Sequence, residues 1–264
     1  MKLKTKYLNN RRDAINSLLQ KPKRLYTPAT FHKLRIELKK LDAFFDLIKY
    51  GSKDFKHKKT FKPFKMIFKH AGKVRELQVE EAMLKKYFLN NLLTGYSNSL
   101  KKLRLQEQKD YFSIANKKLV SELKKKYLVI VPFVAQMDKK KVKNYMKKKK
   151  NKIEKLLSQD TLETPQVHAL RKRLKKFNYN KKSLDLDKQK KSLPNKDVLP
   201  ELMGKWYDYQ VVIKHLKKSM NTTGINPKEV TQCETVKANI SSDSQDLFNK
   251  IKAAIHTSNF SQFN

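Results

Sequence analysis

The sequence predicts an all-α protein, and three observations lead to that fold class. Glycine and proline supply only 13 of the 264 residues, about 5% of the chain where roughly 12% is usual. This scarcity of turn residues argues against an all-β chain with a tight turn about every ten residues. Hydrophobic residues make up 39% and aromatic residues 10%, and they recur at helical spacing. Blocks of this helical pattern also occur twice, which indicates an internal duplication.

The first helix is predicted from a block in which apolar residues follow a helical spacing. That block has two arginines, Arg11 and Arg12, between the apolar positions Tyr7, Leu8, Ile15, Leu18 and Leu19. The next helix is predicted to begin after Thr27, which is a good N-cap and is followed by a proline suited to the first helical position. His32, Arg35 and Lys39 lie together opposite an apolar stripe of Leu34, Leu38, Leu41, Phe45 and Ile48.

The rest of the chain is also helical in pattern. Four further segments are predicted to be helical, namely 61–89, 94–125, 139–158 and 196–219. Thr164, again followed by a proline, is predicted to cap a helix in which His168, Arg171 and Lys175 are grouped and Leu170, Leu174 and Phe177 point inward. A last helix is predicted where Ser242-x-x-Gln245, typical of a capping box, precedes Leu247, Ile251 and Ile255.

Three blocks occur twice in the same order with small deletions between them, which favours duplication over chance similarity of lysine-rich helices. The pairs, at offsets of 138, 136 and 132 residues, are 7–19 with 145–157, 27–35 with 164–171, and 72–79 with 204–211. Gly72 and Gly204, near predicted helix starts, are expected to permit close helix packing. We therefore predict two helical repeats, residues 1–135 and 136–264.

The charge balance is strongly basic. Lysine and arginine number 62 against 24 acidic residues, a formal net charge of +38, and the mean hydropathy is −0.76. Disorder is one reading of such a composition, but the apolar content is enough for a buried core. So large an excess predicts a polyanionic partner, such as nucleic acid, an acidic membrane or a phosphate polymer. Residues 221–264 are neutral, and we expect this stretch to close the fold rather than touch the polyanion.

The single cysteine, Cys233, excludes an internal disulfide and a cysteine-rich metal site, so a cytoplasmic setting is the default expectation. No apolar core of signal-peptide length follows the N-terminus, and the longest apolar run, 127–137, is too short to span a bilayer. Membrane insertion is therefore not expected.

The duplicated motifs resemble those of the conserved histidine α-helical domain, the CHAD family. The two copies are His32-x-x-Arg35-x-x-x-Lys39-Lys40-Leu41 and His168-x-x-Arg171-x-x-x-Lys175-Lys176-Phe177, each followed by a Gly-Lys-x-x-acidic-x-Gln-Val block. The similarity covers about residues 5–257. It implies two related helical bundles about a pseudo-two-fold axis, with a basic surface and a central channel that bind inorganic polyphosphate. It also implies association with polyphosphate granules.

The chain departs from the family pattern in its use of lysine at positions 39, 40, 175 and 176, where relatives tend to have arginine. Asp42 and Asn178 also stand where the family has a further arginine, and Arg75 has Tyr207 as its counterpart. Lysine supplies a hydrated point charge rather than a planar fork that holds phosphate with two hydrogen bonds. We therefore expect binding to depend on charge density, with sharper contacts in the first repeat.

The predicted polyphosphate-binding residues are the cations and histidines of the duplicated blocks, which are Arg11, Arg12, His32, Arg35, Lys39, Lys40, Lys73, Arg75, Lys149, Lys150, His168, Arg171, Lys175, Lys176 and Lys205. Basic residues at i, i+3 and i+7 on two related helices would line a long anion track. The two histidines would donate to phosphate oxygens more strongly below about pH 6.5. A purely structural role, as a capping or packing residue, is an equally open interpretation for each.

No catalysis, cofactor or metal is expected. The sequence has no glycine-rich phosphate loop, no His-Glu-x-x-His and no acidic cluster suited to Mg²⁺, and the remaining histidines follow no metal-ligand spacing. Nucleic acid binding stays open as an alternative, although the usual recognition motifs are not visible. A lipid-surface protein would need an exposed apolar face, which the bundles require for their own packing. The sequence therefore predicts a polyphosphate-binding module with nucleic acid as a weaker competitor.

Overall fold

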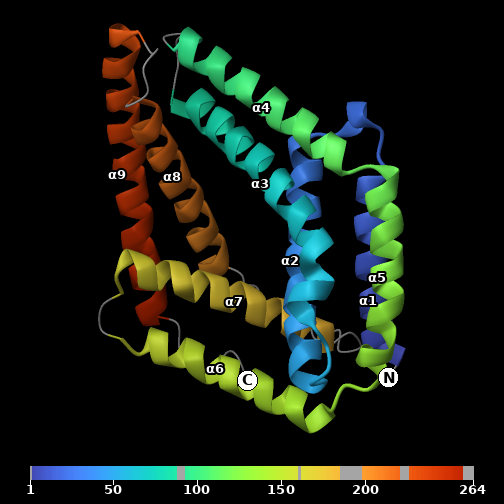
Figure 1. Cartoon of the computed structure of the whole chain (residues 1–264). Coiled ribbons are helices and arrows are strands. Elements are labelled where there is room, and N and C mark those ends of the chain that lie inside the picture. Colours follow the sequence, from blue (N-terminus) through green and yellow to red (C-terminus); the bar gives the residue numbers. More distant parts are fainter. Residues whose placement is uncertain (1, 88–92, 160–161, 185–197, 221–225, 258–264) are drawn as a thin grey trace. The chain divides into compact units, whose positions relative to one another are not determined.

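Every regular element is helical in the part of the chain that the computed structural model describes, residues 2–87, 93–159, 162–184, 198–220 and 226–257 (Figure 1). The elements in these ranges are α1 (Lys2–Leu19), the short 3₁₀ helix η1 (Lys23–Leu25), α2 (Pro28–Gly51), α3 (His57–Tyr87), α4 (Thr94–Ile114), α5 (Lys117–Ala135), α6 (Lys139–Leu157), α7 (Thr164–Leu184), α8 (Val198–Met220) and α9 (Pro227–Thr257). The all-α prediction is therefore confirmed. None of these described helices is long and apolar enough to cross a membrane.

Two predicted segments have different boundaries in the structure. The segment 94–125 contains two helices, because the Asn116 side chain accepts the N–H of Leu119 at 3.0 Å and so starts α5. The predicted capping box at Ser242 is wrong, since Ser242 lies inside α9. A Ser-x-x-Gln spacing fits the surface of a continuing helix as well as a helix start, and the apolar periodicity of α9 extends on both sides of it.

The helix starts at the two threonines also differ from each other. At α2 the prediction is confirmed, because Thr27 Oγ1 accepts the N–H of Thr30 at 3.3 Å. Thr164 is instead the first residue of α7 rather than its cap. The backbone carbonyl of Glu163 accepts the N–H of Gln166. In return, Oε1 of Gln166 accepts the N–H of Glu163 at 2.6 Å. The Gln166 side chain thus supplies one half of a capping box, with Glu163 at the cap position.

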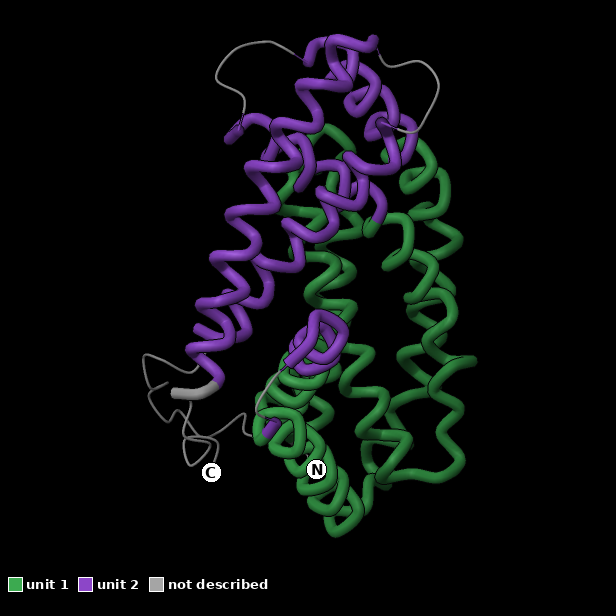
Figure 2. The backbone as a smooth tube through the Cα atoms, turned by 90° about the vertical axis from the view of Figure 1, so that its left-hand side faces the viewer, with its two compact units in different colours: residues 1–72, 108–158, 172–191 green, residues 73–107, 159–171, 192–264 purple. Residues whose placement is uncertain are grey.

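The chain divides into two compact units, each assembled from three separate stretches (Figure 2). The stretches are 1–72, 108–158 and 172–191 in unit 1, and 73–107, 159–171 and 192–264 in unit 2. Helices α3, α4 and α7 therefore each contribute residues to both units. Both predicted repeats, 1–135 and 136–264, likewise supply stretches to both units, and the duplication itself stays a prediction.

Unit 1 has a core rich in aromatic rings. Helix α1 packs against α2 and α5, and α2 also packs against α6. Phe45 is fully buried, and its ring meets those of Phe55, Phe61 and Phe64 nearly edge to face at 5.3, 5.7 and 5.9 Å. Such pairs add about 0.5–1.5 kcal/mol each beyond their buried area. The ring cluster therefore anchors α2 to the first part of α3.

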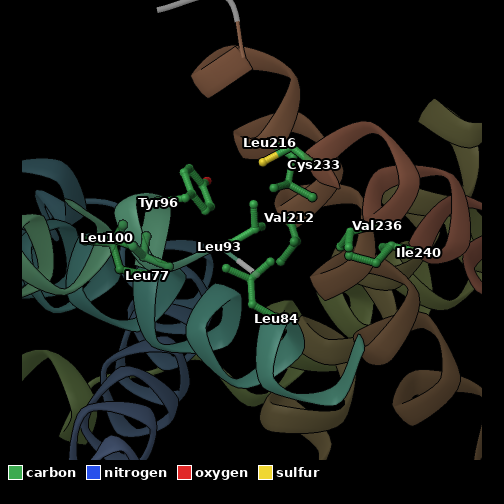
Figure 3. Close-up of a cluster of buried hydrophobic side chains, with 10 residues drawn as sticks. All are labelled: Leu77, Leu84, Leu93, Tyr96, Leu100, Val212, Leu216, Cys233, Val236 and Ile240. Atoms are coloured by element: carbon green, nitrogen blue, oxygen red, sulfur yellow. The ribbon is translucent and has the colours of Figure 1, made fainter. Parts of the chain in front are cut away.

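Unit 2 pairs α8 with α9 around a second core (Figure 3). Its buried residues are Leu77 and Leu84 of α3, Leu93 with Tyr96 and Leu100 of α4, Val212 and Leu216 of α8, and Cys233, Val236 and Ile240 of α9. The Glu229 carboxylate at the start of α9 also accepts the N–H groups of Gly95 and Tyr96, at 2.8 and 3.1 Å, where α4 begins. The described part of the neutral stretch, residues 226–257, therefore contributes to closing this core, as expected from the charge distribution.

Candidate functional site

A cationic pocket of about 210 Å³ lies in unit 1 between α6 and the later part of α7, and we call it the α6–α7 pocket. Its lining residues are Tyr145, Met146, Lys149 and Lys152 from α6, and Arg173, Lys176, Phe177 and Asn180 from α7. Four of these eight residues are cations and none is acidic. A concave surface lined by charges of one sign concentrates its field, so this pocket attracts anions.

Helical periodicity explains why these residues share one surface. On α6, Tyr145, Lys149 and Lys152 follow one another at spacings of four and three, which places them on one face. The lining residues of α7 follow the same rule from Arg173 onward. Nη1 of Arg173 also donates to the backbone carbonyl of Lys152 at 3.1 Å, which ties the two helices together beside the pocket.

Burial and the charges around the pocket shift the pKa of Lys149. Burial lowers the pKa of Lys149, Asp46 acts in the opposite direction, and the nearby charges of Lys176, Lys152 and Arg173 lower it again. The ammonium also lies 5.0 Å from the centre of the Tyr145 ring, within the range of a cation–π contact. An anion in the pocket would relieve the repulsion between these cations. Anion binding would therefore also stabilise the charged form of Lys149.

Lys176 is also held by two carboxylates of α2. Its ammonium pairs with Asp46 and lies 3.7 Å from Oδ2 of Asp42. His57 contacts the same two carboxylates, with Nε2 2.9 Å from Asp42 and Nδ1 2.8 Å from Asp46. Burial lowers the pKa of His57, but the hydrogen bonds to Asp42 and Asp46 outweigh it and the net shift is upward. The pKa of Asp46 falls to about 2, because His57 and Lys176 together outweigh its burial.

The His57 contacts predict a pH-dependent contribution to stability. Because the folded protein has the higher pKa, the contribution is fully present below the unfolded pKa of about 6.5 and is lost as pH rises through the folded value. We expect the free energy of unfolding of His57→Gln to fall less than that of the parent between pH 6 and pH 9. Urea unfolding at several pH values measures this difference. Parallel curves for the two proteins would contradict a protonated His57.

Two of the predicted binding residues, Lys149 and Lys176, lie in the α6–α7 pocket, and Lys150 is outside its lining. Lys152 and Arg173 also line it but are not among the residues predicted from the duplicated blocks. Each stands three residues from a predicted cation on the same helix, so the i, i+3 spacing was a signal that could have found them.

Another pair of predicted cations gathers around Phe68. The guanidinium of Arg35 lies 4.4 Å from the ring centre and Lys39 lies 5.8 Å from it, while Nη1 of Arg35 donates to the Phe68 carbonyl at 3.1 Å. A methyl group at Gly72 would overlap the same Nη1, so the glycine makes room for the guanidinium. Gly72 thus permits close packing as predicted, although it lies in the middle of α3 rather than near a helix start.

Most of the other predicted cations contact acidic side chains. Their pairs are Arg11 and Lys40 with Glu37 at 2.5 and 2.7 Å, Arg12 with Asp13 at 2.9 Å, Lys73 with Glu107 at 2.8 Å, Lys150 with Glu154 at 3.7 Å, and Lys205 with Glu201 at 3.8 Å. The exposed pairs among these contribute about 0–1 kcal/mol each, whereas Arg11 and Glu37 are largely buried. A polyanion that supplies several charges at once can therefore replace the acids of the exposed pairs as partner.

In unit 2 the predicted residues His168 and Arg171 share one aromatic neighbour. The His168 ring lies 4.9 Å from the Tyr207 ring at an angle of 32°, and the Arg171 guanidinium lies 4.1 Å from the same ring. Arg171 is only 8% exposed, so its packing contacts dominate. The second motif is divided, because its lysines at 175 and 176 belong to unit 1. His32 is exposed, whereas Arg75 and Lys175 are half-buried.

No group of three or more His, Cys, Asp or Glu residues in the described ranges could hold a metal ion. The two-fold anion track predicted from the sequence stays a prediction, since its residues are distributed over both units.

Comparison with known proteins adds one result. No family model matches the chain, and no curated protein matches it. Among solved structures, the crystal structure of the CHAD domain from the plant Ricinus communis is similar, with a TM-score of 0.76 and 15% sequence identity. The match covers 97% of this chain and 91% of that one. At this level of identity the similarity establishes the fold alone.

Proposed function

We propose that this chain, an all-α protein with a CHAD-like fold, binds inorganic polyphosphate and that the α6–α7 pocket is one of its contact sites. The observation that carries the proposal is the convergence of four cations on a pocket whose lining contains no acid. The sequence motifs that resemble the polyphosphate-binding family support it, as does the fold. The net charge of +38 supports a polyanionic ligand in general.

The ligand's chemistry matches this site. A polyphosphate chain carries about one negative charge per phosphate, and cations that neutralise it release condensed counterions, so affinity should fall steeply with salt. Lysine ammonium groups suit a repeating row of oxygens because they need no fixed orientation. The planar guanidinium of Arg173 adds a fork that can hold two oxygens of one phosphate. Binding of this kind requires neither a bond-breaking step nor a metal, so we propose a binding module rather than an enzyme.

This function implies a place in the cell. A protein that binds polyphosphate through many exposed lysines would accumulate wherever the polymer is concentrated. We therefore propose a cytoplasmic protein associated with polyphosphate granules, with the single cysteine consistent with a reducing compartment.

Competition between polyanions tests the proposed ligand. Labelled long-chain polyphosphate is bound to the protein at moderate salt and displaced with unlabelled polyphosphate, RNA or DNA at equal phosphate concentration. We expect polyphosphate to displace the label at a concentration about tenfold lower than either nucleic acid, because flexible phosphates without bases can enter a narrow pocket. Equal displacement by RNA or DNA would show that the site selects charge alone and would favour nucleic acid binding.

A further inference from the structure

We propose that the α6–α7 pocket takes the end of a polyphosphate chain and that the outer face of α6 takes the phosphates that follow. The inference rests on the proposed polyphosphate binding and adds which part of the polymer the pocket recognises. Four independent features of unit 1 support it. They are the charge of the pocket, the polar groups at its buried wall, the lining residue that it shares with a hollow on α6, and the contrast with the matching positions of the first repeat.

The charge of the pocket suits a terminal phosphate better than an internal one. A terminal phosphate has three non-bridging oxygens and approaches two negative charges at neutral pH, with a second pKa near 6 as in a phosphate monoester. An internal phosphate has two such oxygens and one charge. Even with Lys176 paired to Asp46, the other three cations of this pocket of about 210 Å³ carry more positive charge than a single internal phosphate can balance.

The buried wall of the pocket offers a hydrogen-bond donor and an acceptor. Tyr145 is 4% exposed and Asn180 is 1% exposed, and both line the pocket. The Asn180 amide is near enough to lower the pKa of Tyr145 against the larger, raising effect of burial. Yet neither the Tyr145 hydroxyl nor Asn180 Oδ1 has a hydrogen bond of normal geometry to another described residue. Buried polar groups are paired as a rule, so a ligand group that reaches them would be favoured.

A terminal phosphate can pair with the Tyr145 hydroxyl. As a dianion among the cations of the pocket it has three non-bridging oxygens, so one can accept from this hydroxyl while the others face the cations. An internal phosphate has only two such oxygens and one charge. The polar wall therefore adds to the preference of the cations for the end of a chain over its middle.

The pocket shares a lining residue with a second basic surface. Lys152 lines both the α6–α7 pocket and a wider hollow of about 450 Å³ on α6. The other residues of that hollow are exposed, namely Asn144, Lys147, Lys148, Asn151 and Lys155. Its lysines are point charges on an open helix face, and they suit a row of phosphates with one charge each. A chain whose end occupies the pocket can therefore continue past Lys152 along α6.

At the matching positions of the first repeat, two side chains differ from those that line the α6–α7 pocket. By the offset of 136, Glu37 corresponds to Arg173, and Glu37 binds both Arg11 and Lys40. By the same offset Phe44 corresponds to Asn180, and its ring packs on Tyr7 at 5.1 Å. Glu37 thus pairs with the cations there and a phenyl ring packs on the tyrosine, whereas in the second repeat the acid partners of Lys176 are Asp42 and Asp46 on α2. At these two positions the second repeat has Arg173, which is a third cation, and Asn180, which is an amide. A cation and a hydrogen-bonding amide are groups that an anion site requires.

The test compares native polyphosphate with the same polymer whose two ends are blocked as phosphoramidates, in chains of about 15 phosphates. We expect the native polymer to compete about tenfold better at equal phosphate concentration, as one charge-assisted hydrogen bond and one charge are lost on blocking. The difference should shrink as chains lengthen, because ends become scarce. Equal competition by both polymers at every length overturns the end assignment. Failure of both polymers to bind would instead overturn the proposed function.

Two conservative variants connect this preference to the pocket. Tyr145→Phe removes one buried hydroxyl and keeps the ring, and it is expected to reduce the preference for free ends to about threefold or less. Tyr127→Phe is the matched control, because Tyr127 also has a buried hydroxyl without a hydrogen-bond partner among the described residues of unit 1 but lies in a different cavity, between α1 and α5. It should retain the parent's preference. An unchanged preference in Tyr145→Phe would place end recognition elsewhere and overturn the proposal.

Discussion

Replacing the four cations of the α6–α7 pocket together by glutamine is expected to weaken polyphosphate binding about 100-fold at moderate salt. Each cation is within a shared pocket and can form a charge-assisted contact, worth about 1.5–3 kcal/mol before screening. A total loss near 3 kcal/mol allows for the strong screening of partly exposed groups. Fluorescence anisotropy with labelled long-chain polyphosphate measures the change in Kd.

The salt dependence of the same variant gives a second, independent readout. Each lost contact with a single-stranded polyanion lowers the slope of log K against log salt by about 0.7, so four lost contacts should lower it by about 3. The single replacement Arg173→Glu introduces the acid that the first repeat has at the matching position, residue 37. We expect it to reproduce much of the loss of affinity. The quadruple variant also loses the Lys176–Asp46 pair and the hydrogen bond from Arg173 to the Lys152 carbonyl, so its helical content is checked by circular dichroism before affinities are compared.

A matched control distinguishes the effect of the pocket on affinity from the effect of total charge. Four exposed lysines at the start of α3 lie in the same unit and outside the pocket, namely Lys58, Lys59, Lys62 and Lys65. Replacing these by glutamine removes the same formal charge, and we expect it to weaken binding by less than about fivefold. If both quadruple variants lose affinity equally, the ligand responds to net charge and the pocket has no special role.

Truncation of Phe45 to alanine is expected to lower the free energy of unfolding by about 3–5 kcal/mol. The ring is fully buried and meets three other phenylalanine rings, so its removal leaves a cavity in the core of unit 1. Whole domains are stable by only about 5–15 kcal/mol, so this single change removes a large share. Denaturant unfolding followed by circular dichroism measures the loss.

Leu128→Ala is the control for this truncation. Leu128 is 74% exposed on α5, so its removal should change the free energy of unfolding by no more than about 0.5 kcal/mol. A loss for Phe45→Ala as small as that of Leu128→Ala would mean that the ring cluster does not hold unit 1 together. A loss shared equally by both would point to a general sensitivity of the chain.

The helices could be predicted because helix formation depends on nearby residues. The stripe on α2 is an example, since Leu34, Leu38 and Leu41 are all fully buried as their spacing predicts. Thr27 caps the same helix through an atom three residues away. The break inside 94–125 is not evident from apolar periodicity, because it depends on the Asn116 side chain that caps α5.

The candidate site could be predicted only in part. Lys149 and Lys176 come from the duplicated blocks, but Arg173 and Lys152 line the same pocket because α6 packs beside α7. His57 was assigned no role, since its two carboxylate partners lie on another helix and 11 to 15 residues away in sequence. The buried hydroxyl of Tyr145 is likewise not evident from the sequence, because its surroundings come from another helix.

The sequence by itself determined that this protein is helical and strongly basic, because spacing, capping and composition act within a few turns of chain. It could not determine which cations act together. Arg11 and Lys149 occupy matching positions of the duplicated blocks, yet Arg11 pairs with Glu37 and Lys149 enters the α6–α7 pocket. Those outcomes depend on side chains brought in by other helices, and only tertiary packing selects these neighbours.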